Sequence, residues 1–193
     1  VSNNKKLGKV KIVKGRHKGK YIYSLSLEER KTCPTSCFHW KTCYGNNMPF
    51  AHRFMGNDAL MKRLDDELNL LSIKHKEGIL IRLHVVGDFF SVNYVKFWKK
   101  MLAKYSNISI FGYTARTPFS NIGKEIVILR SLEWDRFSVR FSNSMEKLSA
   151  NSENLLDNKQ GIICPEQLDK TKNCASCGLC WNKNIDNIIF KTH

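Results

Sequence analysis

The sequence lacks the segments that would carry a protein into or across a membrane. No apolar run approaches the roughly 18 residues that a membrane-spanning helix needs. The N-terminal stretch VSNNKKLGKVKIVKG has no apolar block of the kind found in signal peptides. The chain starts at Val1 rather than at methionine, so we expect a few residues to precede it. These features predict a cytoplasmic protein without a membrane partner.

Acidic residues are also scarce. Asp and Glu number 17 against 32 Lys and Arg, which gives a net charge of +15. This excess favours an acidic partner such as DNA or RNA, and the segment from Lys5 to Lys20 is basic enough to serve as an arm for phosphate. A genome that drifts toward lysine on solvated surfaces would give the same excess. The sequence has no Gly-rich phosphate loop, which excludes an ordinary P-loop nucleotide site.

The chain does contain a regular alternation of strand-like and helix-like segments. Apolar or alternating runs predict strands at residues 9–13, 21–27, 79–86, 108–114, 136–142, 161–163 and 187–193. Apolar residues at helical spacing predict helices at residues 54–75, 92–105 and 121–132, and a fourth from Ser142 or Asn143 to about residue 156. The first two strands would form an N-terminal hairpin.

This alternation predicts an α/β fold with mostly parallel strands. The five or six strands available to such a sheet are too few for a closed barrel of about eight strands. We therefore favour a compact or partial (β/α) barrel, although a doubly wound sheet fits the same pattern. With 42% hydrophobic residues, residues 1–193 are expected to form one domain, with a cysteine-rich segment at residues 161–193 packed on it.

Chemically versatile residues follow the predicted strands at the point where each strand ends. In parallel α/β folds, ligands and catalytic groups gather beyond the carboxyl ends of the strands. We therefore expect these residues to meet at one rim of the sheet. They are Cys33, Asp88, Thr114, Arg116, Asn143, Cys164 and His193.

Four cysteines near the C-terminus have the spacing of a metal site. Cytoplasmic thiols stay reduced, so the seven cysteines of the chain are expected to bind metal rather than to form disulfides. The spacing C-x9-C-x2-C-x2-C resembles the ferredoxin run, in which a Cys-Pro step also occurs. A four-iron cluster or a zinc ion would suit four thiolates. The four residues are Cys164, Cys174, Cys177 and Cys180.

The remaining three cysteines, Cys33, Cys37 and Cys43, form a second group with the spacing C-x3-C-x5-C. Three protein ligands on a four-iron cluster would leave one iron open to water, substrate or cofactor, and this predicts a catalytic cluster. The alternative is a closed structural zinc site of the Cys3His type. Its histidine would be one of His39, His52, His84 and His193.

Several blocks together resemble the gene product 88 family of phages and bacteria. They are T-C-P-x-x-C followed by Cys43-Tyr44, RLHVVGDFFS with YVKFW, FGYTAR, and ICPEQ with C-x-x-C-G-L-C-W. More distantly, three cysteines after the first strand of a parallel barrel are similar to radical S-adenosylmethionine enzymes, which implies S-adenosylmethionine as a candidate cofactor. Those enzymes space their cysteines x3 then x2, and they carry a Gly-Gly-Glu-like element that is missing here.

Three further residues are candidates for catalysis. His84 and Asp88 flank a predicted strand end, where an imidazole and a carboxyl could share a proton or orient a ligand. Arg116, with Tyr113 and Thr114, could contact a phosphate or carboxylate. A buried core histidine, a helix-capping aspartate and a surface arginine would explain the same residues without catalysis.

These patterns lead to two hypotheses about function. The first is an enzyme with two four-iron clusters, one of them open, that acts on a nucleic acid or a nucleotide drawn in by the basic surface. The second is a module without catalytic activity, stapled by zinc, that binds nucleic acid or another partner.

Overall fold

The computed structural model describes residues 11–153 and 161–191, in which seven strands form one sheet. The sheet order is β1-β2-β3-β4-β5-β7-β6, and every neighbouring pair is parallel. The sheet is open, with β1 and β6 at its edges. The strands are β1 (Tyr21–Leu25), β2 (Ile79–Leu83), β3 (Ile108–Thr114), β4 (Phe137–Ser142), β5 (Ser149–Ser152), β6 (Ile162–Ile163) and β7 (Asn187–Phe190).

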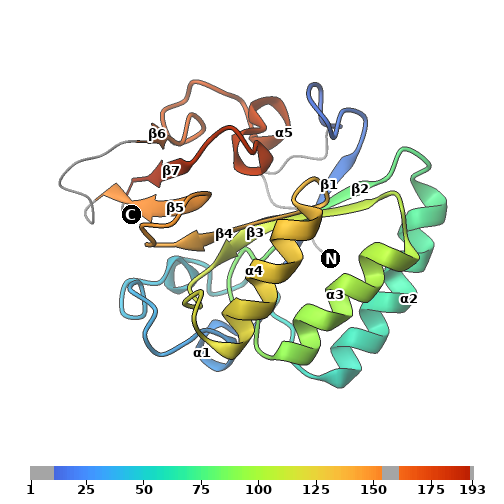
Figure 1. The fold of residues 1–193 in the computed structure, drawn as a ribbon, viewed down its shortest axis with the longest axis horizontal. Coiled ribbons are helices and arrows are strands. Elements are labelled where there is room, and N and C mark those ends of the chain that lie inside the picture. Colours follow the sequence, from blue (N-terminus) through green and yellow to red (C-terminus); the bar gives the residue numbers. More distant parts are fainter. Residues whose placement is uncertain (1–10, 154–160, 192–193) are drawn as a thin grey trace.

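Three long helices cover one face of this sheet, and the C-terminal segment lies on the other (Figure 1). The long helices are α2 (Asp58–Lys74), α3 (Val92–Lys104) and α4 (Asn121–Glu133). Each helix is capped at its N-terminus by a side chain that accepts a hydrogen bond from a backbone N–H of the first turn. The capping residues are Asn57, Ser91 and Ser120 respectively. Short helical turns are α1 (Glu29–Thr32), η1 (Tyr44–Asn47), α5 (Cys174–Cys177) and η3 (Leu179–Trp181).

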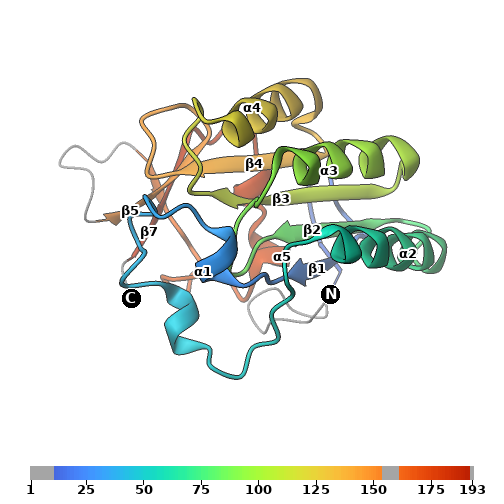
Figure 2. The ribbon, with the colours of Figure 1, turned by 90° about the horizontal axis from the view of Figure 1, so that it is seen from below.

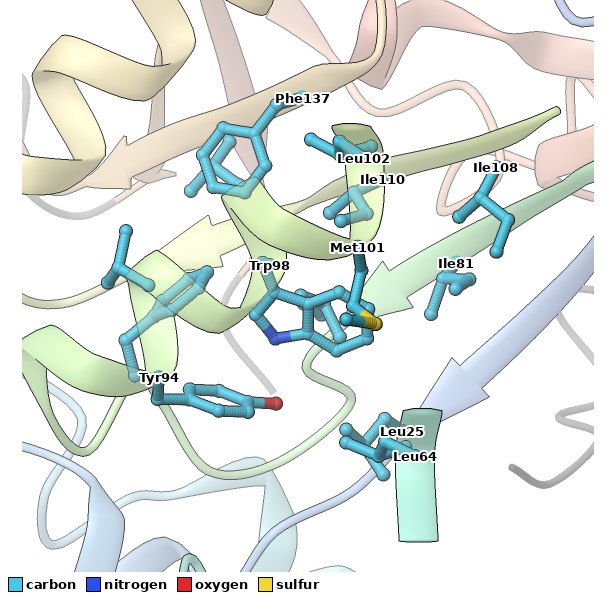
Figure 3. Packing of buried hydrophobic residues seen from close by; sticks show 14 of the residues in the cluster. Leu25, Leu64, Ile81, Tyr94, Trp98, Met101, Leu102, Ile108, Ile110 and Phe137 are labelled. Carbon is cyan, nitrogen blue, oxygen red and sulfur yellow. The ribbon is translucent and has the colours of Figure 1, made fainter. Parts of the chain in front are cut away.

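The larger core lies between the sheet and these helices. Figure 3 shows Trp98 of α3 near Met101, Leu64 of α2, and Leu25 and Ile81 of the strands. All are at most 3% exposed, so they hold α2 and α3 firmly on the sheet. Among the described residues, no helix combines the length and apolar character needed to cross a bilayer.

A second, smaller core lies on the opposite face. Ile22, Leu80 and Phe111 of the strands pack there against Ala175 and Trp181 of the C-terminal segment. This contact fixes the C-terminal cysteines against the face of the sheet opposite the long helices. It also explains why Leu80 of β2 is buried on this face while Ile79, Ile81 and Leu83 are buried on the other.

The expected α/β fold with a parallel, unclosed sheet is confirmed, with differences in detail. The helix predicted from Ser142 or Asn143 is wrong, because β5 occupies residues 149–152 and joins β4 to β7. Its Ser-Ala-Asn-Ser sequence carries no strand signal, and the strand forms between β4 and β7, where Asn151 also bonds to Ser144 and to Asn187 of β7. Residues 9 and 10 of the predicted N-terminal hairpin lie outside the described residues, and within residues 11–25 the hairpin is one antiparallel bridge, between Lys11 and Tyr21.

His17 joins the N-terminal turn to the C-terminal segment and makes stability depend on pH. Its ring is 2% exposed and lies 6.0 Å from the Trp181 ring. Burial, with nearby Lys20 and Arg16, lowers the pKa of His17 from 6.5 to about 4. The folded state therefore binds fewer protons than the unfolded state between these pH values, and stability falls as the pH falls. At pH 5 this linkage costs about 2 kcal/mol.

We expect His17→Gln to remove that share of the pH dependence. The measurement is the free energy of unfolding in urea at pH 7 and pH 5, for wild type and variant. Exposed His52 supplies the control, because His52→Gln removes an imidazole that is not buried against the C-terminal segment. An equal loss of stability on acidification in wild type and His17→Gln would contradict the prediction.

Candidate functional site

The strands end at a cleft with a volume of about 710 Å³. Figure 2 shows the segment between α1 and α2 at the same end of the sheet as the end of β7. Residues from these distant parts of the chain line the cleft together. Six of the seven cysteines are among them: Cys33, Cys37, Cys43, Cys164, Cys174 and Cys180. The two cysteine groups therefore face a common space.

The first group lies on the loop that follows α1. Arg53 holds this loop in shape, since its guanidinium pairs with Glu29 at 2.7 Å and donates to three backbone carbonyls. Burial, with the negative charges of Asp88, Cys37 and Cys43, raises the pKa of Cys33 to about 12. Burial also raises the pKa of Cys37. Burial and mutual repulsion together mean that thiolates at these positions would need a cation between them to be stable.

The second group lies on the C-terminal segment. A reciprocal cap between Asn173 and Ser176 begins α5, and Gly178 ends it with a positive φ of 78° that favours glycine. The Tyr113 hydroxyl donates to Cys180 Sγ at 2.7 Å. Burial raises the pKa of Cys180 to about 11 and that of Cys174 to about 12, with neighbouring cysteines adding to both shifts.

The donor chemistry of both groups suits a soft metal centre, because partly buried thiols surround a shared space. Within residues 11–153 and 161–191, however, no three His, Cys, Asp or Glu side chains are arranged to hold a metal ion. A four-iron cluster bonds each thiolate to a different iron, so it fits sulfurs that are spread more widely than those around one zinc ion.

His84 and Asp88 both line the cleft, but no hydrogen bond joins them among the described residues. His84 Nε2 lies 3.1 Å from the Tyr94 hydroxyl, and its ring packs on Phe89. Burial lowers the pKa of His84 to about 3, so the imidazole is neutral. The structure therefore shows no direct contact through which the two side chains could share a proton.

Asp88 ties the end of β2 to the end of β3. Its carboxylate accepts from the Phe89 and Ala115 amides and from the Thr114 hydroxyl, each at 2.7 Å. Burial raises the pKa of Asp88 to about 6 in spite of these bonds. Ser91, not Asp88, caps α3, so the alternative of a helix-capping aspartate is wrong.

Arg116 lies beside the first cysteine group without lining the cleft. Its guanidinium donates to the carbonyls of Phe89 and Thr32, the residue before Cys33. This contact holds Cys33 close to the end of β3, and the alternative of a free surface arginine does not hold. Asn143 and Cys164 line the cleft as expected, whereas His193 lies outside the described residues.

A model of the family described as "Gene product 88" matches residues 1–183. The chain belongs to the gene product 88 family. Similar proteins are the Gene 88 proteins of Mycobacterium phage L5 and Mycobacterium phage D29. Each is 24% identical to this chain, and each alignment covers 83% of this chain and 82% of the phage protein. No solved structure matches the chain.

Two arginines of this gene product 88 family member are functional candidates that the sequence reading missed. Arg82 of β2 lines the cleft, and buried Arg140 of β4 donates to carbonyls of the C-terminal segment. Each interrupts an apolar strand, in ILIRL and FSVRF. A single arginine inside a strand buried on both faces was the signal that could have identified them.

Proposed function

We propose that this protein is an iron–sulfur enzyme of the cytoplasm that acts on a nucleotide or nucleic acid in the cleft. Cys33, Cys37 and Cys43 would hold a four-iron cluster with one open iron. The four C-terminal cysteines would hold a second cluster. The observation that carries the proposal is that both groups open into one cleft at the carboxyl ends of parallel strands.

A cluster with an open iron supplies a Lewis acid or an electron to a ligand that reaches it. The chain would provide the rest of the site. Arg53 and Arg116 fix the cysteine loop, and Asp88 holds the ends of β2 and β3 together. The Tyr113 hydroxyl would stabilise the Cys180 thiolate. Phe38 and His39, which also line the cleft, would limit the access of water to the first group.

A narrower form of the proposal is a reaction of the radical S-adenosylmethionine type. Three cysteines beyond the first strand of a parallel sheet support it. The x5 gap before Cys43 and the missing Gly-Gly-Glu-like element after β2 count against it. We therefore retain the broader proposal.

The nucleic-acid part of the proposal depends on charge. In the part of the basic segment that the structure describes, Lys11, Lys14, Arg16 and Lys18 are exposed on a turn next to β1. Lys11 pairs there with Glu77 and Arg16 with Asp135, which leaves Lys14 and Lys18 as the cations available to phosphate. Such a surface predicts binding to DNA or RNA that weakens steeply as salt rises.

A module stapled by zinc is the second candidate function. Its support is the way the C-terminal cysteines pack, because Cys174 and Cys180 lie against a small core around Trp181, as structural metal ligands do. It predicts colourless protein with about two zinc ions per chain.

The deciding experiment is the content of iron, acid-labile sulfide and zinc, with a visible spectrum, on protein purified without oxygen. We expect about eight irons per chain and broad brown absorption, the sum of two four-iron clusters. Zinc without iron would overturn the proposal in favour of the stapled module. Iron at about four per chain would leave only one of the two groups as a cluster site.

A further inference from the structure

Arg82 is a positively charged side chain that lines the cleft. It extends from β2 on the face of the sheet that carries the C-terminal segment, and it is partly buried. Its Nε is buried and has no hydrogen-bond partner. Its guanidinium lies 5.7 Å from the centre of the Tyr113 ring, and within the described residues it forms no ion pair. A partly buried guanidinium with an unpartnered Nε is well suited to bind an anion.

His84 is a second unpartnered polar group in the same cleft. The residue is 4% exposed, and its Nδ1 has no hydrogen-bond partner. Its other ring nitrogen, Nε2, is already engaged with the Tyr94 hydroxyl. A buried nitrogen of this kind costs stability unless a ligand bonds to it.

Two acidic side chains line the cleft, Asp88 and Glu166, and within the described residues neither forms an ion pair with Arg82. Both carboxylate oxygens of Asp88 accept hydrogen bonds from the end of β3 and from Phe89. The negative charge of Asp88 helps to raise the pKa of Cys33 and Cys37. The positive charge of Arg82 opposes the rise in pKa that burial causes at Cys174 and Cys180. Asp88 thus lies on the side of the first cysteine group, and Arg82 lies with Glu166 on the side of the second.

The rest of the cleft suits an organic ligand of moderate size. Val85, Val86 and Phe111 give it apolar wall, and Lys191 adds a second cation at its edge. Its volume of about 710 Å³ lies in the usual range for sites that bind small molecules. An anionic group at Arg82 would leave the remainder of such a ligand directed toward the first cysteine group.

We propose that the cleft binds a small molecule that carries a phosphate or carboxylate on an apolar or aromatic body of mononucleotide size. Arg82 binds the anionic group, and His84 Nδ1 bonds to a polar atom of the ligand body. This deepens the proposed function by naming the ligand class, and it rests on the cleft of that proposal, not on its iron.

Isothermal titration calorimetry on the full chain, purified without oxygen, tests the proposal. The probes are AMP, N-acetyltryptophan and adenosine, which carry a phosphate, a carboxylate and no charge. We expect one or both anionic probes to bind, and adenosine to bind at least tenfold more weakly than AMP if phosphate is the group recognised. Stronger binding of N-acetyltryptophan would identify a carboxylate as the group.

Variants separate binding at Arg82 from attraction to a positively charged surface. Arg82→Met should weaken the better anionic probe about 10- to 100-fold, the usual effect of losing a charge-assisted pair. Arg82→Lys, which keeps the charge but not the fork of donors, should weaken it less. Exposed Arg63 on α2 is the matched control, and Arg63→Met should bind as the wild type does.

Three results would overturn the inference. The first is that neither AMP nor N-acetyltryptophan binds. The second is that AMP and adenosine bind equally well while N-acetyltryptophan does not bind. The third is that Arg82→Met binds the better anionic probe as tightly as the wild type does. If Arg82→Met instead loses metal from the C-terminal cysteines while its affinity is unchanged, Arg82 serves those thiolates and not a ligand. Binding that depends on Arg82 in a protein that contains zinc and no iron would uphold this inference and refute the iron–sulfur proposal.

Discussion

Replacing Cys37 with alanine is expected to remove about half of the bound iron, roughly four of about eight atoms per chain. The variant should also lose any reaction that depends on the open iron. The reason is that Cys37 belongs to the three-thiol group, where no spare ligand can take its place. The C-terminal group should stay occupied, because a separate core around Trp181 and Ala175 holds it in position. Iron, acid-labile sulfide and the visible spectrum measure the effect.

The reciprocal variant makes this experiment a comparison between the two groups. Cys177→Ala should deplete the C-terminal group and leave the first group loaded. Ser36→Ala, at an exposed position next to Cys37, should retain all the metal. Loss of both metals in Cys37→Ala would mean that the two sites are structural parts of one folding unit, and the catalytic interpretation would fail.

The sequence predicted those helices and strands whose own residues carry a capping or strand-forming signal. The strand at residues 108–114 appears with those bounds, and α3 and α4 begin at the predicted residues. In each case a capping serine or a run of β-branched residues marks the element. The convergence of strand ends also followed from the sequence, because the carboxyl ends of parallel strands share one edge. Cys33, Asp88, Asn143 and Cys164 meet there as expected.

The features that the sequence could not predict depend on distant contacts. β5 consists of four small residues, and it exists because β4 and β7 lie on either side of it. Asp88 follows β2 as predicted, but its role depends on Thr114 and Ala115, which lie more than 25 residues away. The strand predicted at residues 79–86 ends at Leu83, although Val85 and Val86 still form backbone hydrogen bonds with Leu25 and Leu27.

The largest effect on stability is expected from Arg140→Met. Arg140 is fully buried on β4 and donates at 2.8 Å to the carbonyls of Cys180, Asn182 and Ile185. Its guanidinium also lies 5.5 Å from the centre of the Trp134 ring. Methionine would fill a similar volume but leave these partly buried carbonyls without their donors. Several charge-assisted bonds are lost at once, so we expect a loss of about 4 kcal/mol.

Denaturation in urea measures that loss, and a chelator competition assay measures the accompanying effect on the C-terminal cysteines. Because Arg140 fixes the chain directly after Cys180, the variant should release metal from that group faster than the wild type. Arg140→Lys should recover part of the stability, since an ammonium can reach some but not all of these carbonyls. Arg63→Met controls for the loss of one positive charge. A loss below about 1 kcal/mol in Arg140→Met, the range of ordinary surface changes, would show that the C-terminal segment is held mainly by the packing of Trp181 and its neighbours.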